Sequence, residues 1–210
     1  FSYINNKRSN MPNHVSTFIS IEASSDIILY LKKFIVKGIF DDITWDQLEN
    51  LTTLNLYSLL YEDWPTEDNT PSWPDREYMI NNISAKWCYL QTYYFHESNE
   101  ILELTFESAW DAPESLIYRL VDHINYKFKD SEFEMNITSE DEGYNHVSGG
   151  YANQFGCEFY CDHDPPFEYP DPDNFDDVEH DQAVDNFYQE VEDHKMKLLL
   201  DAKEEIKLYP

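Results

Sequence analysis

The stretch HVSTFISIEASSDIILYLKKFIVKG, His14–Gly38, changes its hydrophobic period in the middle. Its first part alternates apolar with polar side chains and is rich in β-branched residues, which is typical of a strand over His14–Ala23. Serines suited to cap a helix follow, and the next apolar side chains fall on one helical face: Ile27, Leu31, Phe34 and Ile35. Gly38 is suited to end that helix. The stretch therefore predicts a strand that leads directly into a helix.

The same two periods recur downstream. Thr44–Asn50 predicts a short helix, with Asn55–Tyr61 as an ordered segment beside it, and the proline- and aspartate-rich residues 61–75 predict a loop. Two strand-like runs follow, Ile83–Phe95 and Glu100–Trp110, and the short connector HESN between them suits a hairpin.

A second long helix is predicted after these strands, with Asp111 as its cap and Pro113 in its first turn. SEFEMNITSE then predicts another strand. The order β-α-(insert)-β-β-α-β is that of a ferredoxin-like split βαβ fold. We therefore expect an α+β domain over residues 11–160, with an insert around 40–80 and helices on one face of an antiparallel sheet.

The rest of the chain adds further segments to this domain. Tyr144–Val147 and Phe155–Tyr160 predict a short added hairpin. Residues 161–182 form an acidic, proline-rich segment, and residues 183–210 predict an amphipathic helix of roughly 40 Å, long enough to leave the domain or to pair with another copy. Residues 1–10 precede Met11 and are interpreted as an N-terminal extension.

Negative charge is the strongest compositional feature. The formal net charge is −28, and the stretch from Asp130 to His194 carries 20 acidic residues with no lysine or arginine. A field of this sign repels nucleic acid and anionic membranes and attracts basic surfaces. Direct nucleic-acid or membrane binding is therefore disfavoured, and a basic partner is expected.

The cysteines indicate the compartment. Three of them, with no secretory signal ahead, predict a reducing environment, and no apolar run approaches a membrane span, so we expect a cytoplasmic protein. Cys157, Cys161 and His163, with His146 or His180, have spacings compatible with zinc. Small buried thiols beside a solvated histidine are the favoured alternative, so no metal or cofactor is predicted. The aspartate runs also do not match a calcium-binding loop.

Four segments resemble the YubB-like family of small plasmid and phage proteins: MPNHVS (Met11–Ser16), NISAKWCYLQT (Asn82–Thr92), FESAWDAPESLIYRL (Phe106–Leu120) and SEDEGYNHVSGGY (Ser139–Tyr151). The resemblance implies a ferredoxin-like domain and an origin in a mobile element. It brings no established activity and no catalytic residues. The chain departs from the family pattern at Ser84-Ala85, where a Gly-Thr pair is usual, and in its long acidic extension.

Catalytic motifs are absent from the sequence. No nucleophile elbow, Walker loop, metalloprotease helix or dinucleotide-binding loop occurs, and five glycines leave little for a phosphate-binding loop. Lys86, Trp87 and Trp110 are candidates for a small-molecule pocket, although core positions are the favoured interpretation of the two tryptophans.

The acidic third of the chain has two interpretations. One is a solvated linker. The other is an ordered surface that imitates nucleic-acid phosphates, favoured by the interleaved aromatic residues and stiffening prolines. The leading hypothesis is a non-enzymatic phage or plasmid accessory protein, an anti-defence inhibitor that binds a basic host nuclease, defence or nucleoid protein. The alternatives are an assembly subunit that oligomerises through its C-terminal helix and a small-molecule-binding or enzymatic domain. The expected partner-binding residues are Glu140, Asp141, Glu142, Asp162, Asp164, Asp171, Asp173, Asp176, Asp177, Glu179 and Asp181.

Overall fold

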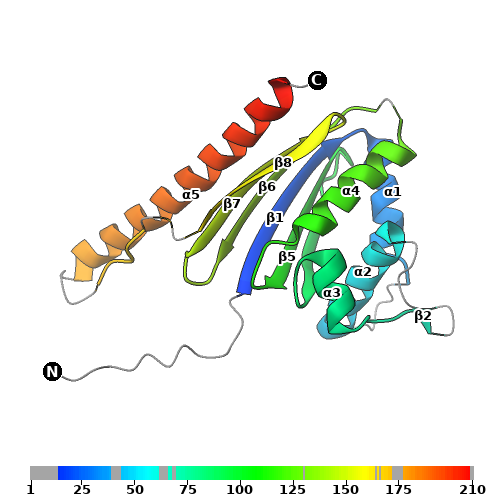
Figure 1. Ribbon diagram of the computed structural model, residues 1–210, viewed down its shortest axis with the longest axis horizontal. Helices are drawn as coiled ribbons and strands as arrows, with labels where there is room; N and C mark the ends of the chain where they lie inside the picture. Colours follow the sequence, from blue (N-terminus) through cyan, green and yellow to red (C-terminus); the bar gives the residue numbers. More distant parts are fainter. Residues whose placement is uncertain are drawn as a thin grey trace.

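The computed structural model describes residues 14–38, 44–61, 66–67, 70–129, 131–163, 165, 167–171 and 177–208. Within them an open, antiparallel six-stranded sheet has the order β4-β5-β1-β6-β7-β8 (Figure 1). Its strands are β1 (His14–Ala23), β4 (Cys88–Phe95), β5 (Ile101–Ala109), β6 (Phe133–Asp141), β7 (His146–Asn153) and β8 (Gly156–His163). The short strands β2 (Thr66–Glu67) and β3 (Thr70–Pro71) pair separately.

Five helices are present in the described chain, and they cover both faces of the sheet. One face carries α1 (Ser25–Ile35), α2 (Trp45–Leu60), α3 (Arg76–Ile83) and α4 (Glu114–Lys127), and the other carries α5 (Asp177–Leu208) (Figure 1). The helices within residues 11–160 therefore lie on one face, as expected, and the added C-terminal helix covers the other face. Because side chains alternate along a strand, Ile19 and Ile21 of β1 enter the main core while Phe18 lies on the α5 side.

α2 is longer than expected. It begins with a capping box between Thr44 and Gln47 and runs as one helix through the stretch that was expected to separate two segments. β-Branched residues weaken the helical pattern there, but the hydroxyl of Thr53 donates to the Glu49 carbonyl oxygen at 2.7 Å and also accepts from the Leu90 N–H at 2.8 Å. The buried hydroxyl of Tyr57 donates to the Cys88 carbonyl oxygen at 3.0 Å, so α2 is bonded to β4.

The loop expected over residues 61–75 leads into the helix α3 and not directly into a strand. Asp75 accepts a hydrogen bond from the Tyr78 N–H at 2.9 Å and caps α3, so the strand expected from Ile83 begins at Cys88. The cap expected at Asp111 is also wrong, because α4 begins after Pro113. In β4 the pairing with β5 slips between Leu90 and Thr92, which marks a bulge.

The hairpin expected after β6 is longer than predicted and extends the main sheet. β7 pairs along β6, and β8 forms the outer edge, so the acidic segment expected from Cys161 begins inside β8. Its last residues, from Asp177, belong to α5. At 32 residues α5 is about 48 Å long.

α5 packs directly on β7. A Cβ added to Gly149 would lie 2.2 Å from the Leu199 nitrogen and 2.6 Å from the Lys195 carbonyl oxygen, both in the backbone of α5. Val147 and Tyr151 contact α5 on either side of this glycine. The glycine therefore allows the helix and the strand to approach closely.

Candidate functional site

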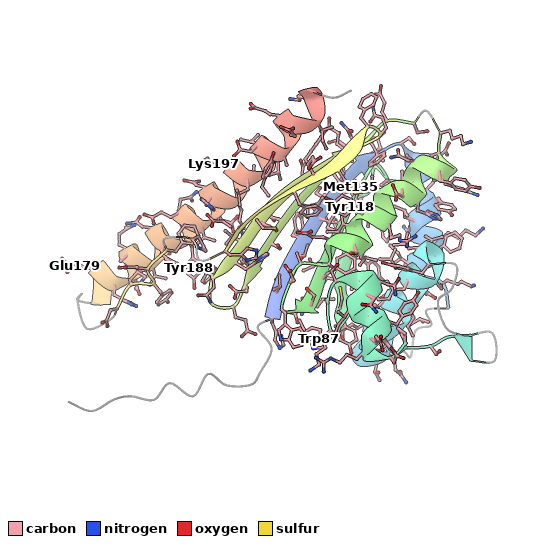
Figure 2. The ribbon with its side chains drawn as sticks, in the orientation of Figure 1. Trp87, Tyr118, Met135, Glu179, Tyr188 and Lys197 are labelled. Carbon is pink, nitrogen blue, oxygen red and sulfur yellow. The ribbon has the colours of Figure 1, made fainter. Side chains whose placement is uncertain are left out.

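The most acidic part of the described chain is a projection that we call the acidic arm, defined as residues 167–171 and the first half of α5, residues 177–193. This half of α5 extends past the end of the sheet where β6 turns into β7 (Figure 1), and Glu179 lies at its tip (Figure 2). The second half of α5 lies along β7 and β8.

An aromatic cluster holds the arm together. The ring of Phe187, which is 4% exposed, lies 5.1 Å from Tyr144 of the β6–β7 turn and 5.2 Å from Tyr169. Phe167 contacts both Phe187 and His194, at 6.3 and 5.4 Å between ring centroids. The two parts of the arm and the β6–β7 turn are thus joined by edge-to-face aromatic contacts.

Ion pairs attach α5 to the sheet below the arm. The ammonium of Lys195 lies 2.7 Å from Glu140 of β6 and also contacts Glu192, and Lys203 lies 2.8 Å from Glu134. Burial alone lowers the pKa of Lys195, but its bonds to Glu140 and Glu192 outweigh that effect and raise this pKa above its ordinary value. Lys195 therefore stays charged at neutral pH.

Carboxylates cover the exposed side of the arm. Residues 177–193 contain seven acidic residues and no lysine or arginine. Burial and the charge of Glu140 raise the pKa of Tyr144 beside the arm to about 12. A raised tyrosine pKa is expected where negative charge is concentrated, because nearby carboxylates disfavour the tyrosinate anion.

Three of the expected partner-binding residues are used inside the protein. Asp141 is 3% exposed and accepts hydrogen bonds from the Asn145 and His146 N–H groups at 2.7 and 3.1 Å. Glu140 binds Lys195, and Asp162 lies 3.0 Å from His194. These carboxylates fix the β6–β7 turn and α5 rather than face a partner.

The other expected residues fall in or near the arm. Glu142 in the β6–β7 turn, Asp171, Glu179 and Asp181 are exposed, and Asp177 begins α5. Asp164, Asp173 and Asp176 lie outside the described residues. The structure adds exposed acids that sequence reasoning missed, among them Asp185, Glu190 and Asp193. Their positions beside or opposite the helical face of Phe187 and Val191 were the signal in the sequence that could have identified them.

The zinc ligands considered from sequence do not converge. Cys161 and Cys157 lie on one face of β8 but four residues apart, which is about 13 Å along a strand, and His180 belongs to α5 on the other side of the sheet. The described residues contain no group of three or more His, Cys, Asp or Glu side chains able to hold a metal ion.

The two cysteine thiols of β8 are protonated. Burial raises the pKa of Cys157 to about 12, and burial together with the bond that Cys161 donates to Glu114 does the same for Cys161. His146 lies 3.4 Å from His163 between their Nδ1 atoms, and burial lowers the pKa of His146. Thiols in this state are weak nucleophiles and weak metal ligands.

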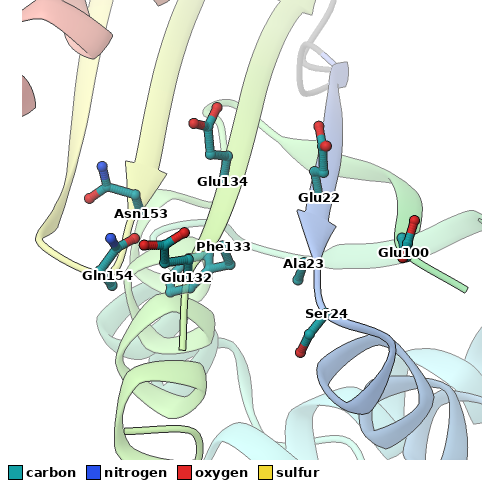
Figure 3. Close-up of a pocket in the computed structure, with 9 residues that line it drawn as sticks. All are labelled: Glu22, Ala23, Ser24, Glu100, Glu132, Phe133, Glu134, Asn153 and Gln154. Atoms are coloured by element: carbon teal, nitrogen blue, oxygen red, sulfur yellow. The ribbon is translucent and has the colours of Figure 1, made fainter. Parts of the chain in front are cut away.

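A pocket of about 550 Å³ opens at the end of the sheet opposite the β6–β7 turn (Figure 3). Its lining residues are Glu22, Ala23, Ser24, Glu100, Glu132, Phe133, Glu134, Asn153 and Gln154. Of the four glutamates, Glu134 binds Lys203, and within the described chain the other three form no ion pair. The pocket therefore adds to the negative surface of the protein.

The three residues expected to form a pocket lie close to one another. Trp87 and Lys86 line a separate depression, and the Lys86 ammonium lies 5.5 Å from the centroid of Trp110. Trp110 is half exposed and Trp87 is partly exposed, so neither tryptophan is a fully buried core residue.

Comparisons with known proteins found no relative: no family model, no curated protein and no solved structure matches this chain. None of the described helices has the length and apolar character needed to cross a bilayer.

Proposed function

We propose that this protein is a non-enzymatic binding protein whose acidic arm occupies the basic, nucleic-acid-binding surface of a host protein. The observation that carries the proposal is the density of carboxylates on an ordered helix. Seven acids over 17 residues of α5, one of which (Glu192) also contacts Lys195, correspond to one carboxylate per about 3.6 Å of axis. One strand of duplex DNA carries a phosphate every ~3.4 Å.

The packing of the arm favours this role over that of a solvated linker. A linker needs no attachment, whereas Phe187 contacts four other aromatic rings, those of Tyr144, Phe167, Tyr169 and Tyr188. Carboxylates held in a fixed arrangement bind a complementary surface with little ordering cost. Charge of one sign also accelerates association and makes it sensitive to salt.

Neutralising the arm is expected to weaken binding at least about tenfold and to flatten its salt dependence by roughly one unit of slope per lost contact. The variant combines Asp181→Asn, Asp185→Asn, Glu190→Gln and Asp193→Asn. The measurement is displacement of labelled duplex DNA from a panel of purified basic DNA-binding proteins of a bacterial host, repeated at increasing salt. The wild type is expected to displace DNA at low salt.

A matched control removes the same charge elsewhere, through Glu77→Gln, Glu97→Gln, Glu100→Gln and Asp122→Asn, all exposed and outside the arm. It is expected to change displacement less than about twofold, because short-range charge placement matters more than net charge. If the wild type displaces DNA from no member of the panel, or if both variants lose equal affinity, the arm is not a phosphate mimic.

We further propose that β4-β5-β1-β6, with the crossovers through α1 and α4, is a split βαβ unit of the ferredoxin-like kind. The antiparallel pairing of β1 with both β5 and β6 supports this assignment, and β7 and β8 would be additions at one edge. An origin in a phage or plasmid, and hence action as an anti-defence inhibitor in a host cytoplasm, rests on the resemblance to YubB-like proteins alone.

A second candidate function is assembly through α5. A groove of about 480 Å³ runs between α5 and the uncovered part of the sheet, and three apolar side chains on it are 40–53% exposed: Phe18, Met196 and Leu200. Deleting the helix cannot test this role, because α5 buries Val147 and Tyr151 of the sheet.

If the groove mediates assembly, Met196→Glu with Leu200→Glu converts an oligomer into a monomer of 25.0 kDa in sedimentation equilibrium. Burying two carboxylates in an apolar contact costs several kcal/mol, which is enough to dissociate a moderate dimer. Tyr126→Glu, at a side chain that is 77% exposed on α4, is the control and leaves the mass unchanged. A monomeric wild type excludes this function.

A further inference from the structure

A second, chemically different depression lies between α3 and the start of β4. It has a volume of about 240 Å³, and its walls include Trp73, Trp87 and Tyr89, with Arg76 and Lys86 beside them. Typical ligand pockets enclose ~300–1,000 Å³, so this one has room for a single ring system. Trp87 lies far from Glu179 at the tip of the acidic arm (Figure 2).

The aromatic walls are fixed before any ligand binds. The indole N–H of Trp73 donates to Asn50 at 3.1 Å, and the Trp73 ring lies 5.0 Å from Tyr89. The Trp87 ring lies 5.8 Å from Tyr89 and 5.0 Å from His14. Aromatic side chains held in this way favour a planar ligand that can stack on them. Because these side chains are already ordered in the free protein, binding costs little of their conformational entropy.

Two cations stand at the edge of these walls. The Arg76 guanidinium lies 5.4 Å and the Lys86 ammonium 5.5 Å from the centroid of Trp110, which is half exposed. Within the described chain neither forms an ion pair, whereas Lys195 and Lys203 both bind glutamates. Most other lysines and arginines of the described residues also form no ion pair, so what sets this pair apart is its place beside an aromatic depression.

The backbone at Trp110 gives an independent indication. Its φ is +78°, in the left-handed region that bulky residues avoid, and this strain is of a kind that gathers at ligand sites. The turn is held by Ser108, whose hydroxyl donates to the Asp111 carbonyl oxygen at 2.6 Å. The Ala109 N–H donates to the Trp87 carbonyl oxygen at 3.0 Å, so the two tryptophan-bearing segments are bonded together.

We propose that this depression binds a mononucleotide. The base stacks on one of the aromatic rings that line it (Trp73, Trp87 or Tyr89), and the phosphate is held by Arg76 and Lys86. The guanidinium fork matches phosphate oxygens two at a time, and a lysine adds a point charge. Base–aromatic stacking tolerates any base, so the site selects a ring with an attached phosphate rather than one nucleobase. This inference is independent of the acidic arm.

The test is calorimetric titration of the full-length protein with AMP, adenosine and ribose 5-phosphate. AMP is expected to bind at least tenfold more tightly than either fragment, because only AMP uses both the wall and the cations. The double variant Arg76→Gln/Lys86→Gln is expected to lose at least tenfold in AMP affinity and to bind adenosine as the wild type does.

A matched control is Arg119→Gln/Lys32→Gln. It removes an arginine 5.4 Å from the Tyr61 ring and a lysine 5.1 Å from the Phe95 ring, so it takes away the same charges and the same type of contact outside the depression. It is expected to bind AMP as the wild type does. The proposal is overturned if AMP binds no more tightly than its two fragments, if none of the three produces heat, or if the control loses as much affinity as the site variant.

Discussion

Replacing Gly149 with alanine is expected to lower the free energy of unfolding by about 3 kcal/mol or more, at the upper end of overpacking effects. The new Cβ would lie 2.2 Å from the Leu199 nitrogen, 2.6 Å from the Lys195 carbonyl oxygen and 2.7 Å from the Leu198 carbonyl carbon. All three atoms belong to the backbone of α5, so no change of side-chain rotamer relieves the contact. The helix has to move away from β7 and gives up part of its apolar contact with Val147 and Tyr151.

Gly156 is the matched control, since a Cβ added there meets nothing within 4 Å. We expect Gly156→Ala to change stability by no more than ~0.5 kcal/mol. Urea unfolding followed by circular dichroism measures both variants, and hydrogen exchange shows whether protection in α5 falls selectively. Equal stability of the two alanine variants would mean that α5 does not lie on β7.

Truncating Phe187 to alanine is expected to cost about 3 kcal/mol, because a buried phenyl ring leaves a cavity when it is removed. The ring is 4% exposed and is the centre of the aromatic cluster, with Tyr144, Tyr169 and Tyr188 at 5.1, 5.2 and 5.5 Å. Its loss is expected to release the acidic arm while the second half of α5 stays in place through Ala202 and Ile206.

Hydrogen exchange resolved along the chain checks this expectation. Protection should fall over residues 177–193 and persist from Lys195 onward. The control is Phe155→Ala in the β7–β8 turn, where the ring is 59% exposed and little packing is lost. The Phe187 variant should also displace DNA from basic proteins more weakly than the wild type, although its charge is unchanged. If the Phe187 variant displaces DNA weakly while residues 177–193 keep their full protection from hydrogen exchange, then the proposed function does not depend on the order of the arm.

The alternation of side chains made the central strands predictable. β1 matches its expected bounds, and β5 and β6 lie within a residue or two of theirs, because each has one buried and one more exposed face. β7 was recognised only in part because it is buried on both faces, between α5 and the main core, so polar and apolar residues do not alternate. Its two glycines also weaken the strand pattern.

The acidic arm was predictable in composition but not in detail. Runs of acids with interleaved aromatic residues pointed to residues 161–182 and to the helix after them. Which carboxylates turn inward depends on partners far away in sequence: Glu140 meets Lys195, and Asp162 meets His194. Arg76 was missed at the aromatic depression for the same reason, since its nearness to Trp110 follows from the packing of α3.

The bulge between Leu90 and Thr92 affects whether another chain can pair with the edge of the sheet. An open sheet offers its outermost strands as templates on which a foreign chain can add a further strand, which is one route to fibrils. At β4 the irregular spacing of peptide groups interrupts that template, and β8 carries Glu158 and Asp162 along the opposite border. We therefore expect partners to bind through the side chains of this protein and not by adding a β-strand to the edge of its sheet. For the same reason we expect concentrated solutions of the protein to resist cross-β aggregation.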